Sequence, residues 1–268
     1  FGNTVVDKAN GADLQLHNVS WETPKGFSAK LEGNPMNINK DIKLFQTEYN
    51  QDFTLAFWFK VDSLKRPVME GDAVSDRPLV SLFAAGSESL SDKGEGKMRI
   101  GFDANNHLML RTEGNNIDFG IGNDYVKTGQ WHYLTLVSDH SQNLASLYID
   151  GNMVNETTAD RIGRITGTPI TFGSEGYHGY IDEISMWHLA LPQSYINDIK
   201  TTALTGKEKE LNAYISFETD ELQGDNLMKT VFSSLNQKVS EETGNIIGDV
   251  MFDPATVGHE EAIHAPMK

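Results

Sequence analysis

The chain has 268 residues, a formal net charge of −16 and no cysteine. The negative charge argues against a nucleic-acid partner, because nucleic-acid binding depends mainly on lysine and arginine neutralising phosphates. The lack of cysteine removes disulfides and thiolate metal sites. No stretch approaches the roughly 18 consecutive apolar residues that a membrane-spanning helix needs.

The segment DFTLAFWFKVD shows the dominant pattern of the sequence. Its apolar residues Phe53, Leu55, Phe57, Phe59 and Val61 occupy alternate positions. Because successive side chains of a strand point to opposite faces, this alternation predicts a β-strand with one buried face. The segments PLVSLFAAG, TPITFGSEG and GYIDEISMW are further predicted strands.

Short polar turns are predicted to join several strands into hairpins. MRIGFDANNHLMLRTEG is interpreted as two strands around a turn at residues 103–106, and WHYLTLVSDHSQNLASLYIDG as two strands around residues 140–143. The pair Asp150-Gly151 follows the second hairpin. Aspartate and glycine tolerate the positive φ that a tight turn requires, so we interpret this pair as turn chemistry rather than as a ligand site.

One segment has the pattern of a helix. It begins at Pro192, a residue favoured in the first helical turn, continues with Tyr195, Ile196 and Ile199, and ends near Gly206. The sequence therefore predicts an all-β protein. Its expected architecture is a two-sheet antiparallel β-sandwich (jelly roll) with one short C-terminal-side helix.

Four segments, taken together, resemble the laminin-G-like, concanavalin A-like lectin-glucanase jelly-roll family of bacterial surface proteins. They are VVDKANGADLQLHNVSW, FTLAFWFKV, WHYLTLVSD with ASLYIDGNMV, and GYIDEISMWHLALPQSYINDI. The resemblance implies the sandwich fold over residues 1–205. It does not identify a function, because such modules include lectins, adhesion domains and parts of enzymes.

The remaining residues suggest a longer protein. Residues 1–205 are the predicted jelly-roll module and residues 206–268 are its tail. LNAYISFETDELQGDNL, from Leu211, resembles the first strand of a family member, which the module lacks. The tail either completes the sandwich with an extra strand or opens a second similar module. FGNTVVDKANG, at the start, is not a signal segment, so the chain is either cytosolic or lacks its targeting segment. The tail favours the second alternative, and we expect a fragment of a longer multi-module bacterial protein.

No catalytic motif is identified. Glycoside hydrolases need two carboxylates across a cleft, and the Glu-x-Asp-x-x-Glu strand pattern of laminarinase-like relatives does not occur. Asp182 and Glu183 are adjacent, so on a regular strand they point to opposite faces. A zinc-protease motif requires two histidines four residues apart, which places them on one face of a helix. His259 and His264 are five residues apart, so they do not fit this motif. We predict no catalytic residues and no enzymatic activity.

Asp182 is the strongest candidate for a metal ligand. Apolar residues that include Ile184 and Met186 occupy alternate positions with it, which predicts a buried face. A carboxylate there needs hydrogen bonds or a cation. The family resemblance implies a structural Ca²⁺ held by this aspartate, with Asp7 and Asn10 as weaker candidates near the first strand. The alternatives are backbone N–H bonds to Asp182 or a bulge that turns it outward.

Aromatic rings are the candidates for sugar binding, because apolar sugar faces stack on them. Trp58 lies on the face opposite Phe53 and Phe57 and is predicted to line the concave sheet. Tyr133 and Tyr148 are further candidates. The alternative is that these rings belong to the core.

The sequence thus predicts a non-catalytic, lectin-like module that binds carbohydrate on the concave sheet or on loops at the sandwich edge. Its expected partners are glycans or neighbouring protein domains, and its expected location is extracellular or on a bacterial cell surface. The alternatives are a structural or adhesive module without a glycan ligand, and an enzyme with an unrecognised site.

Overall fold

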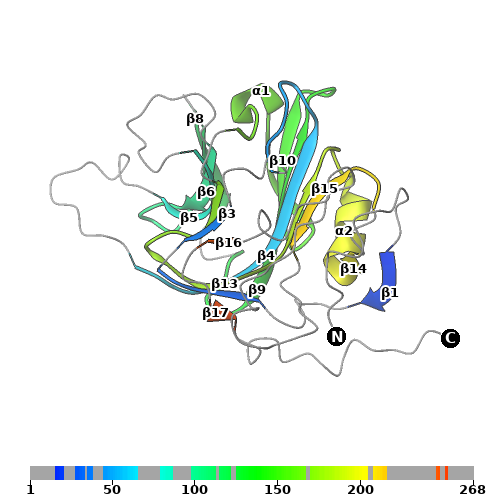
Figure 1. Ribbon diagram of the computed structural model, residues 1–268. Coiled ribbons are helices and arrows are strands. Elements are labelled where there is room, and N and C mark those ends of the chain that lie inside the picture. The colour runs from blue at the N-terminus through cyan, green and yellow to red at the C-terminus, as the bar shows by residue number, and fades with distance from the viewer. Residues whose placement is uncertain are drawn as a thin grey trace.

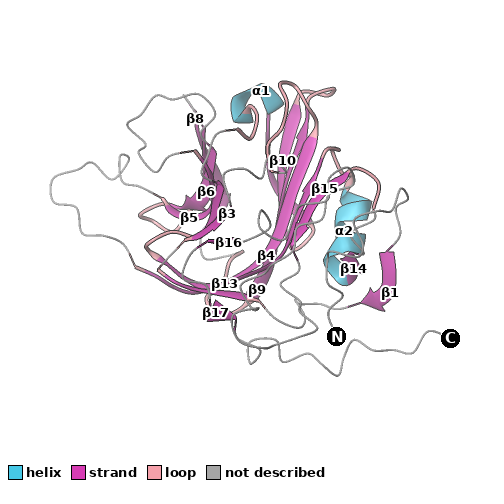
Figure 2. Ribbon diagram, in the orientation of Figure 1, coloured by secondary structure: helices cyan, strands magenta, loops and turns pink. Residues whose placement is uncertain are grey.

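Two large antiparallel sheets pack face to face in the part of the chain that the computed structural model describes (Figures 1 and 2). The described residues are 16–20, 28–33, 35–38, 45–65, 79–86, 98–112, 115–121, 125–166, 170–204, 208–215, 246–247 and 251–252. This arrangement confirms the predicted antiparallel β-sandwich. Asp7 and Asn10 lie outside the described residues.

Among the described residues, the larger sheet has eight strands, with β4 and β13 side by side at its centre. In spatial order its strands are β11 (Asn152–Thr157), β10 (Leu144–Ile149), β9 (Trp131–Asp139), β4 (Phe53–Leu64), β13 (Tyr177–Trp187), β2 (Ala29–Glu32) and β17 (Met251–Phe252), with β15 (Leu211–Ile215) also paired to β13. β15 therefore joins this sheet from beyond residue 205. The domain boundary there stays a prediction.

The smaller sheet has seven strands in the described part of the chain. In spatial order they are β16 (Ile246–Ile247), β3 (Met36–Ile38), β12 (Ile170–Phe172), β5 (Val80–Ala85), β6 (Met98–Phe102), β7 (Leu108–Thr112) and β8 (Asn115–Ile121). A separate pair consists of β1 (Leu16–Ser20) and β14 (Thr202–Leu204). The predicted turns at 103–106 and 140–143 are confirmed as the β6–β7 and β9–β10 connections.

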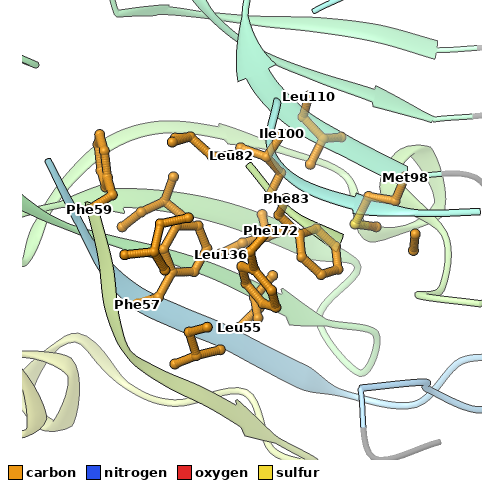
Figure 3. Packing of buried hydrophobic residues seen from close by; sticks show 14 of the residues in the cluster. Leu55, Phe57, Phe59, Leu82, Phe83, Met98, Ile100, Leu110, Leu136 and Phe172 are labelled. Carbon is orange, nitrogen blue, oxygen red and sulfur yellow. The ribbon is translucent and has the colours of Figure 1, made fainter. Parts of the chain in front are cut away.

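The inner faces of the two sheets enclose the main core (Figure 3). Phe57 of the larger sheet and Phe83 of the smaller sheet both pack on Phe172, with ring centroids 5.6 and 5.3 Å apart. All three rings are fully buried. Aromatic rings contribute large apolar areas and prefer such tilted contacts. The predicted buried face of residues 53–61 is therefore confirmed.

Helix α2 (Gln193–Thr201) covers the outer face of the larger sheet (Figure 1). Ile196 and Ile199 of the helix belong to a second buried cluster with Trp187 of the sheet. A helix with one apolar face gains most of its stability from this kind of packing. The outer face of the larger sheet is therefore an interior surface wherever α2 lies on it.

The helix predictions need two corrections. α2 follows Pro192 as predicted, but it ends at Thr201 because Thr202 has an extended backbone conformation and begins β14. The second helix, α1 (Ala159–Ile162), was not predicted, because four residues are too few to show helical periodicity. No helix in the described residues is long and apolar enough to cross a membrane.

Candidate functional site

A pocket of about 290 Å³ lies at one end of the sandwich, between the two sheets. The last residues of β4 form one side and the end of β6 forms another. The turn after β6 and the segment before β9 complete it. The lining residues are Val61, Asp62, Ser63, Leu64, Phe102, Asn106, Val126 and Thr128. Segments that are distant in sequence therefore create this site together.

A β-bulge places Asp62 at the pocket. Val61 and Ser63 pair with consecutive residues of β13, so Asp62 has no residue opposite it. Its side chain is 45% exposed, and its carboxylate lies 4.0 Å from Lys60 Nζ. Bulges take side chains out of the regular alternation and are frequent beside binding sites. The bulge thus presents a carboxylate that a regular strand would not place there.

Tyr177 fixes the backbone beside this bulge. Its hydroxyl lies 2.9 Å from the carbonyl oxygen of Lys60 and 3.0 Å from that of Tyr180. Burial, and then the negative charge of Asp62, raise the pKa of Tyr177 well above its ordinary value of 10. The hydroxyl therefore stays protonated and remains a donor to these carbonyl groups.

The segment before β9 is hydrogen-bonded to β4 and to β9. The Gly129 amide donates to the carbonyl oxygen of Val61 at 2.7 Å. The Lys127 amide donates to Nε2 of His132 at 2.9 Å. Thr128, between these two bonds, is exposed, and Val126, just before them, is buried. The segment therefore has a defined position, with its hydroxyl accessible to a ligand.

The β6–β7 turn holds Asn106 at the pocket in a similar way. The Asp103 carboxylate accepts hydrogen bonds from the backbone amides of Asn105 and His107, both at 2.8 Å. His107 Nδ1 also lies 3.3 Å from the Asp118 carboxylate. Asn106 has a φ of +64°, a conformation that asparagine tolerates better than most residues. The turn therefore has a conformation defined by its own hydrogen bonds.

The chemistry of the pocket suits a ligand with hydroxyl groups and apolar patches. Asp62 accepts hydrogen bonds, the Asn106 amide both donates and accepts, and the Thr128 hydroxyl does the same. Phe102 and Val126 supply buried apolar surface. Small-molecule sites typically combine such an apolar lining with a few convergent polar groups.

The three aromatic residues predicted to bind sugar lie elsewhere. Trp58, Tyr133 and Tyr148 come together on the outer face of the larger sheet, in the cluster that α2 covers. Their exposed fractions are 3%, 2% and 9%. The Trp58 and Tyr133 rings are 5.1 Å apart and pack on each other. Rings covered in this way have no open face for a sugar, so the geometry does not support a stacking role.

The predicted surroundings of Asp182 are wrong in part. A second bulge in β13 leaves Glu183 as an extra residue with a φ of +49°, between Asp182 opposite Trp58 and Ser185 opposite Ala56. Asp182 consequently lies on the outer face.

Beyond the bulge, Ile184 and Met186 belong to the core between the sheets. The Asp182 carboxylate remains fully buried and accepts the backbone N–H of Glu183 at 2.8 Å. This bond and the bulge are the two alternatives to a cation that the sequence left open.

The bulge also changes the relation between Asp182 and Glu183. The Tyr214 hydroxyl donates to the Glu183 carboxylate. Burial, and then Glu183, Asp182 and Glu208, raise the pKa of Tyr214 well above 10. Asp182 lies opposite Trp58, and Glu183 accepts from Tyr214. Because Trp58 and Tyr214 belong to the same cluster on the outer face, the expectation that the two carboxylates point to opposite faces is wrong. They are nevertheless enclosed, with exposed fractions of 0% and 7%.

The described residues do not by themselves complete a calcium site at Asp182. No group of three or more histidine, aspartate or glutamate side chains in the described part of the chain is arranged to hold a metal ion. Ca²⁺ normally takes six to eight oxygen ligands. Asp182 could supply one carboxylate, and the geometry of any partners from the first-strand region is outside the described residues. Calcium binding therefore stays a prediction.

The chain belongs to the Concanavalin A-like lectin/glucanases superfamily. The laminin G family model matches residues 33–197 of the 268. This match agrees with the two-sheet fold and includes the β4 bulge and every lining residue of the pocket. No curated protein matches the chain significantly.

Solved structures share this fold at low sequence identity. A candidate carbohydrate-binding protein from Bacteroides ovatus is similar over 86% of this chain and 60% of its own length, with a TM-score of 0.59 and 11% identity. A heptameric SAP-like pentraxin from Limulus polyphemus matches over 86% of this chain and 95% of its own, with a TM-score of 0.47 and 10% identity.

Domain 4 of the arabinanase AbnA from Geobacillus stearothermophilus, solved with arabinotriose, matches over 72% of this chain and 86% of its own, with a TM-score of 0.45 and 19% identity. At 11% identity, the likeness to the Bacteroides ovatus protein establishes the fold alone.

Proposed function

We propose that this chain is a non-catalytic carbohydrate-binding module of a larger secreted or cell-surface bacterial protein. Its glycan site is the pocket at the Asp62 bulge. The observation that carries the proposal is the lining of this pocket, which brings the carboxylate of Asp62, the amide of Asn106 and the hydroxyl of Thr128 together with apolar residues of both sheets. Support comes from the superfamily, whose members include lectins, and from the location of the pocket at the sandwich edge.

The charge of the protein narrows the class of glycan. The chain carries a net charge of −16, and Asp62 adds a carboxylate at the pocket itself. A negative field lowers the local concentration of anionic ligands. The pocket therefore suits neutral sugars better than uronic acids, sialic acids or sulfated sugars.

Substitution of Asp62 tests the site. We expect Asp62→Asn to weaken binding of a neutral polysaccharide about 10-fold, because a hydrogen bond to a charged acceptor contributes about 1.5–3 kcal/mol. Affinity gel electrophoresis against starch, xylan, arabinan, laminarin and galactomannan identifies a ligand. Isothermal titration calorimetry then compares the variants.

Asp160→Asn is the matched control. Asp160 is exposed on α1, and its backbone N–H bonds to Asn143 in the β9–β10 turn, at the opposite end of β4 from the pocket. Equal weakening by both substitutions would place the glycan elsewhere. If none of the five polysaccharides binds the unaltered chain, the adhesive module without a glycan ligand becomes the better conclusion.

A structural Ca²⁺ at Asp182 is a separate proposal, based on the family resemblance. A ligand that binds only the folded state raises the midpoint of thermal unfolding. If the ion binds there, Ca²⁺ added after EDTA raises this midpoint, and Asp182→Ala removes the increase. An unchanged midpoint would mean that the protein itself satisfies Asp182.

A further inference from the structure

The pocket at the Asp62 bulge encloses only a short piece of a glycan. Its volume of about 290 Å³ is at the lower limit of small-molecule sites, which typically enclose about 300–1,000 Å³. A polysaccharide bound there must continue over the adjoining surface. The side chains of that surface therefore help to determine which sugar chains the protein binds.

A row of alternating aromatic and basic residues crosses the outer face of the larger sheet next to the pocket. Trp131 of β9 is opposite Lys60 of β4. On the other side of β4, Tyr180 of β13 is opposite Lys60, and Lys30 of β2 follows it. Phe59 belongs to the core between the sheets, so the next residue, Lys60, points to the outer face.

The ammonium group of Lys60 is held between two aromatic rings. Its Nζ lies 4.2 Å from the centroid of the Tyr180 ring and 5.7 Å from the centroid of the Trp131 ring. The two ring centroids are 6.0 Å apart. A cation within about 6 Å of an aromatic centroid is attracted to the ring. The Lys60 side chain, which is only 16% exposed, therefore has a defined position.

Lys60 and Asp62 connect this row to the pocket. Two residues of a strand span about 7 Å, so Lys60 lies directly beside the lining. Its Nζ is 4.0 Å from the Asp62 carboxylate, which exceeds the length of about 2.7–3.2 Å that a direct hydrogen bond requires. A bridging group is typical of polar contacts at this separation. A sugar hydroxyl suits the gap, because it accepts from the ammonium group and donates to the carboxylate.

Trp131 offers part of its ring to solvent beside this gap. Tyr180 is 6% exposed and belongs to the interior, whereas Trp131 is partly exposed. Trp131 begins β9, three residues after Thr128 of the pocket lining. The indole ring is a large apolar surface with a polar N–H at one edge. It is therefore suited to pack against the apolar face of a sugar that leaves the pocket.

From this geometry we infer that the glycan site extends over the Lys60–Asp62 pair onto Trp131, and that its ligand is a chain of at least two linked neutral sugars. One sugar lies in the pocket and the next stacks on Trp131, with a hydroxyl held between Lys60 and Asp62. The sugars are neutral because Asp62 already balances the charge of Lys60. The inference rests on the proposed function and adds a second subsite to it.

Chain length provides the first test. Isothermal titration calorimetry compares sugars of one, two and three residues, prepared from whichever of the five polysaccharides binds. We expect the disaccharide to bind at least about 10-fold more tightly than the monosaccharide, because only the disaccharide reaches Trp131. Trp131→Ala should remove this gain and leave monosaccharide binding unchanged. Equal affinities for the monosaccharide and the disaccharide would overturn the inference.

Fluorescence quenching separates stacking on Trp131 from a purely structural role of this residue. Acrylamide quenches indole rings that solvent reaches. We expect a saturating disaccharide to protect part of the tryptophan emission of the unaltered protein. Trp131→Phe keeps a ring for stacking and should retain most of the affinity, but it should lose the protection. Unchanged quenching on binding, or protection that persists in Trp131→Phe, would overturn the inference.

The two lysines of the row form a matched pair of substitutions. Lys60→Met keeps an apolar side chain between the rings and removes the charged donor, so we expect it to weaken disaccharide binding several-fold. Lys30→Met is the control, because Lys30 lies beyond Tyr180 on β2 and its ammonium is 3.0 Å from Glu32. An equal effect of both substitutions would overturn the inference. If Lys60→Met does not fold, the quenching of the unaltered protein decides.

The outcomes also separate this inference from the proposed function. If none of the five polysaccharides binds, the proposed function is overturned and the second subsite with it. If a polysaccharide binds and Asp62→Asn weakens it, but chain length has no effect and Trp131 is not protected, the second subsite alone is overturned.

Discussion

Gly151 lies in a turn that joins two strands and also contacts helix α2. Asp150 and Gly151 have φ values of +55° and +80° and form a two-residue turn between Ile149 and Asn152, as the sequence predicts. The glycine is also packed against α2, where an added Cβ would overlap the side-chain oxygen of Asn197. The turn is therefore a docking point for the helix, which its sequence alone does not reveal.

We expect Gly151→Ala to lower the free energy of unfolding by about 1–2 kcal/mol, through the positive φ and the overlap with Asn197. Urea denaturation followed by circular dichroism measures the change. Gly129→Ala is the matched control, because Gly129 has a φ of +77° but no atom within 4 Å of the added Cβ. An equal loss in both variants would mean that the contact with Asn197 contributes nothing.

The candidate residues identified from the sequence show that local patterns do not reveal which surfaces are covered or where bulges occur. Alternation correctly put Trp58 on the face opposite Phe57, but it could not show that α2 covers that face. The bulge at Glu183 reversed the expected face of Ile184, because the position of a bulge depends on the partner strand as well as on the strand itself. Asp62 was not identified from the sequence because the bulge that presents it also depends on the pairing of β4 with β13.

Helix α2 contributes to stability mainly through its buried face. Ile196 and Ile199 pack with Trp187, while Asp198 between them faces solvent. Pro192 begins the helix and the strand β14 ends it, so only nine residues are helical. An isolated helix of this length is marginal in water. Packing on the sheet must therefore hold it.

We expect Ile196→Ala to reduce the free energy of unfolding by about 2–4 kcal/mol, since it removes a fully buried aliphatic side chain from a packed cluster. Tryptophan fluorescence during urea unfolding reports the loss, because Trp187 belongs to the same cluster. Asp198→Ala, on the exposed face of the same helix, should change stability by less than about 0.5 kcal/mol. A comparable loss in the control would indicate that burial of Ile196 is not the cause, since alanine has the higher helix propensity at both positions.

The fold could be predicted because its two signals, alternation and turn chemistry, are local. The pocket could not be predicted, because it combines residues 61–64 of one sheet and Phe102 of the other with Asn106, Val126 and Thr128 from connecting segments. Their proximity follows from strand pairing over long sequence separations, such as the pairing of β4 with β13. One local signal did exist: the predicted 103–106 turn includes Asn106, although nothing in the sequence linked it to a site.

Buried tyrosines make the stability of the protein sensitive to alkaline conditions. Burial raises the pKa of Tyr133, Tyr177 and Tyr214 above the ordinary value of 10. In the unfolded chain these hydroxyls ionise near pH 10, while the folded protein keeps them protonated. Their contribution to stability is therefore complete below about pH 10 and is lost as the pH rises further, by up to about 1.4 kcal/mol per pH unit for each tyrosine.

We expect the urea midpoint to be constant between about pH 8 and pH 9.5 and to fall steeply above about pH 10. Tyr214→Phe should lower stability at pH 8, because it removes the donor to the buried Glu183 carboxylate. Above pH 10 the same variant should have a shallower slope than the unaltered protein. Identical slopes would show that Tyr214 ionises normally in the folded state.

Because residues of both sheets form the pocket, a ligand bound there would also stabilise the chain against local unfolding. A partly folded molecule in which β4 and β6 have separated has no pocket, so a glycan can bind only the closed sandwich. At a ligand concentration 100 times the Kd, such exclusive binding adds about 2.7 kcal/mol to the free energy of opening. If the proposed glycan site is correct, the chain bound to a polysaccharide would resist proteolysis longer than the same chain without it.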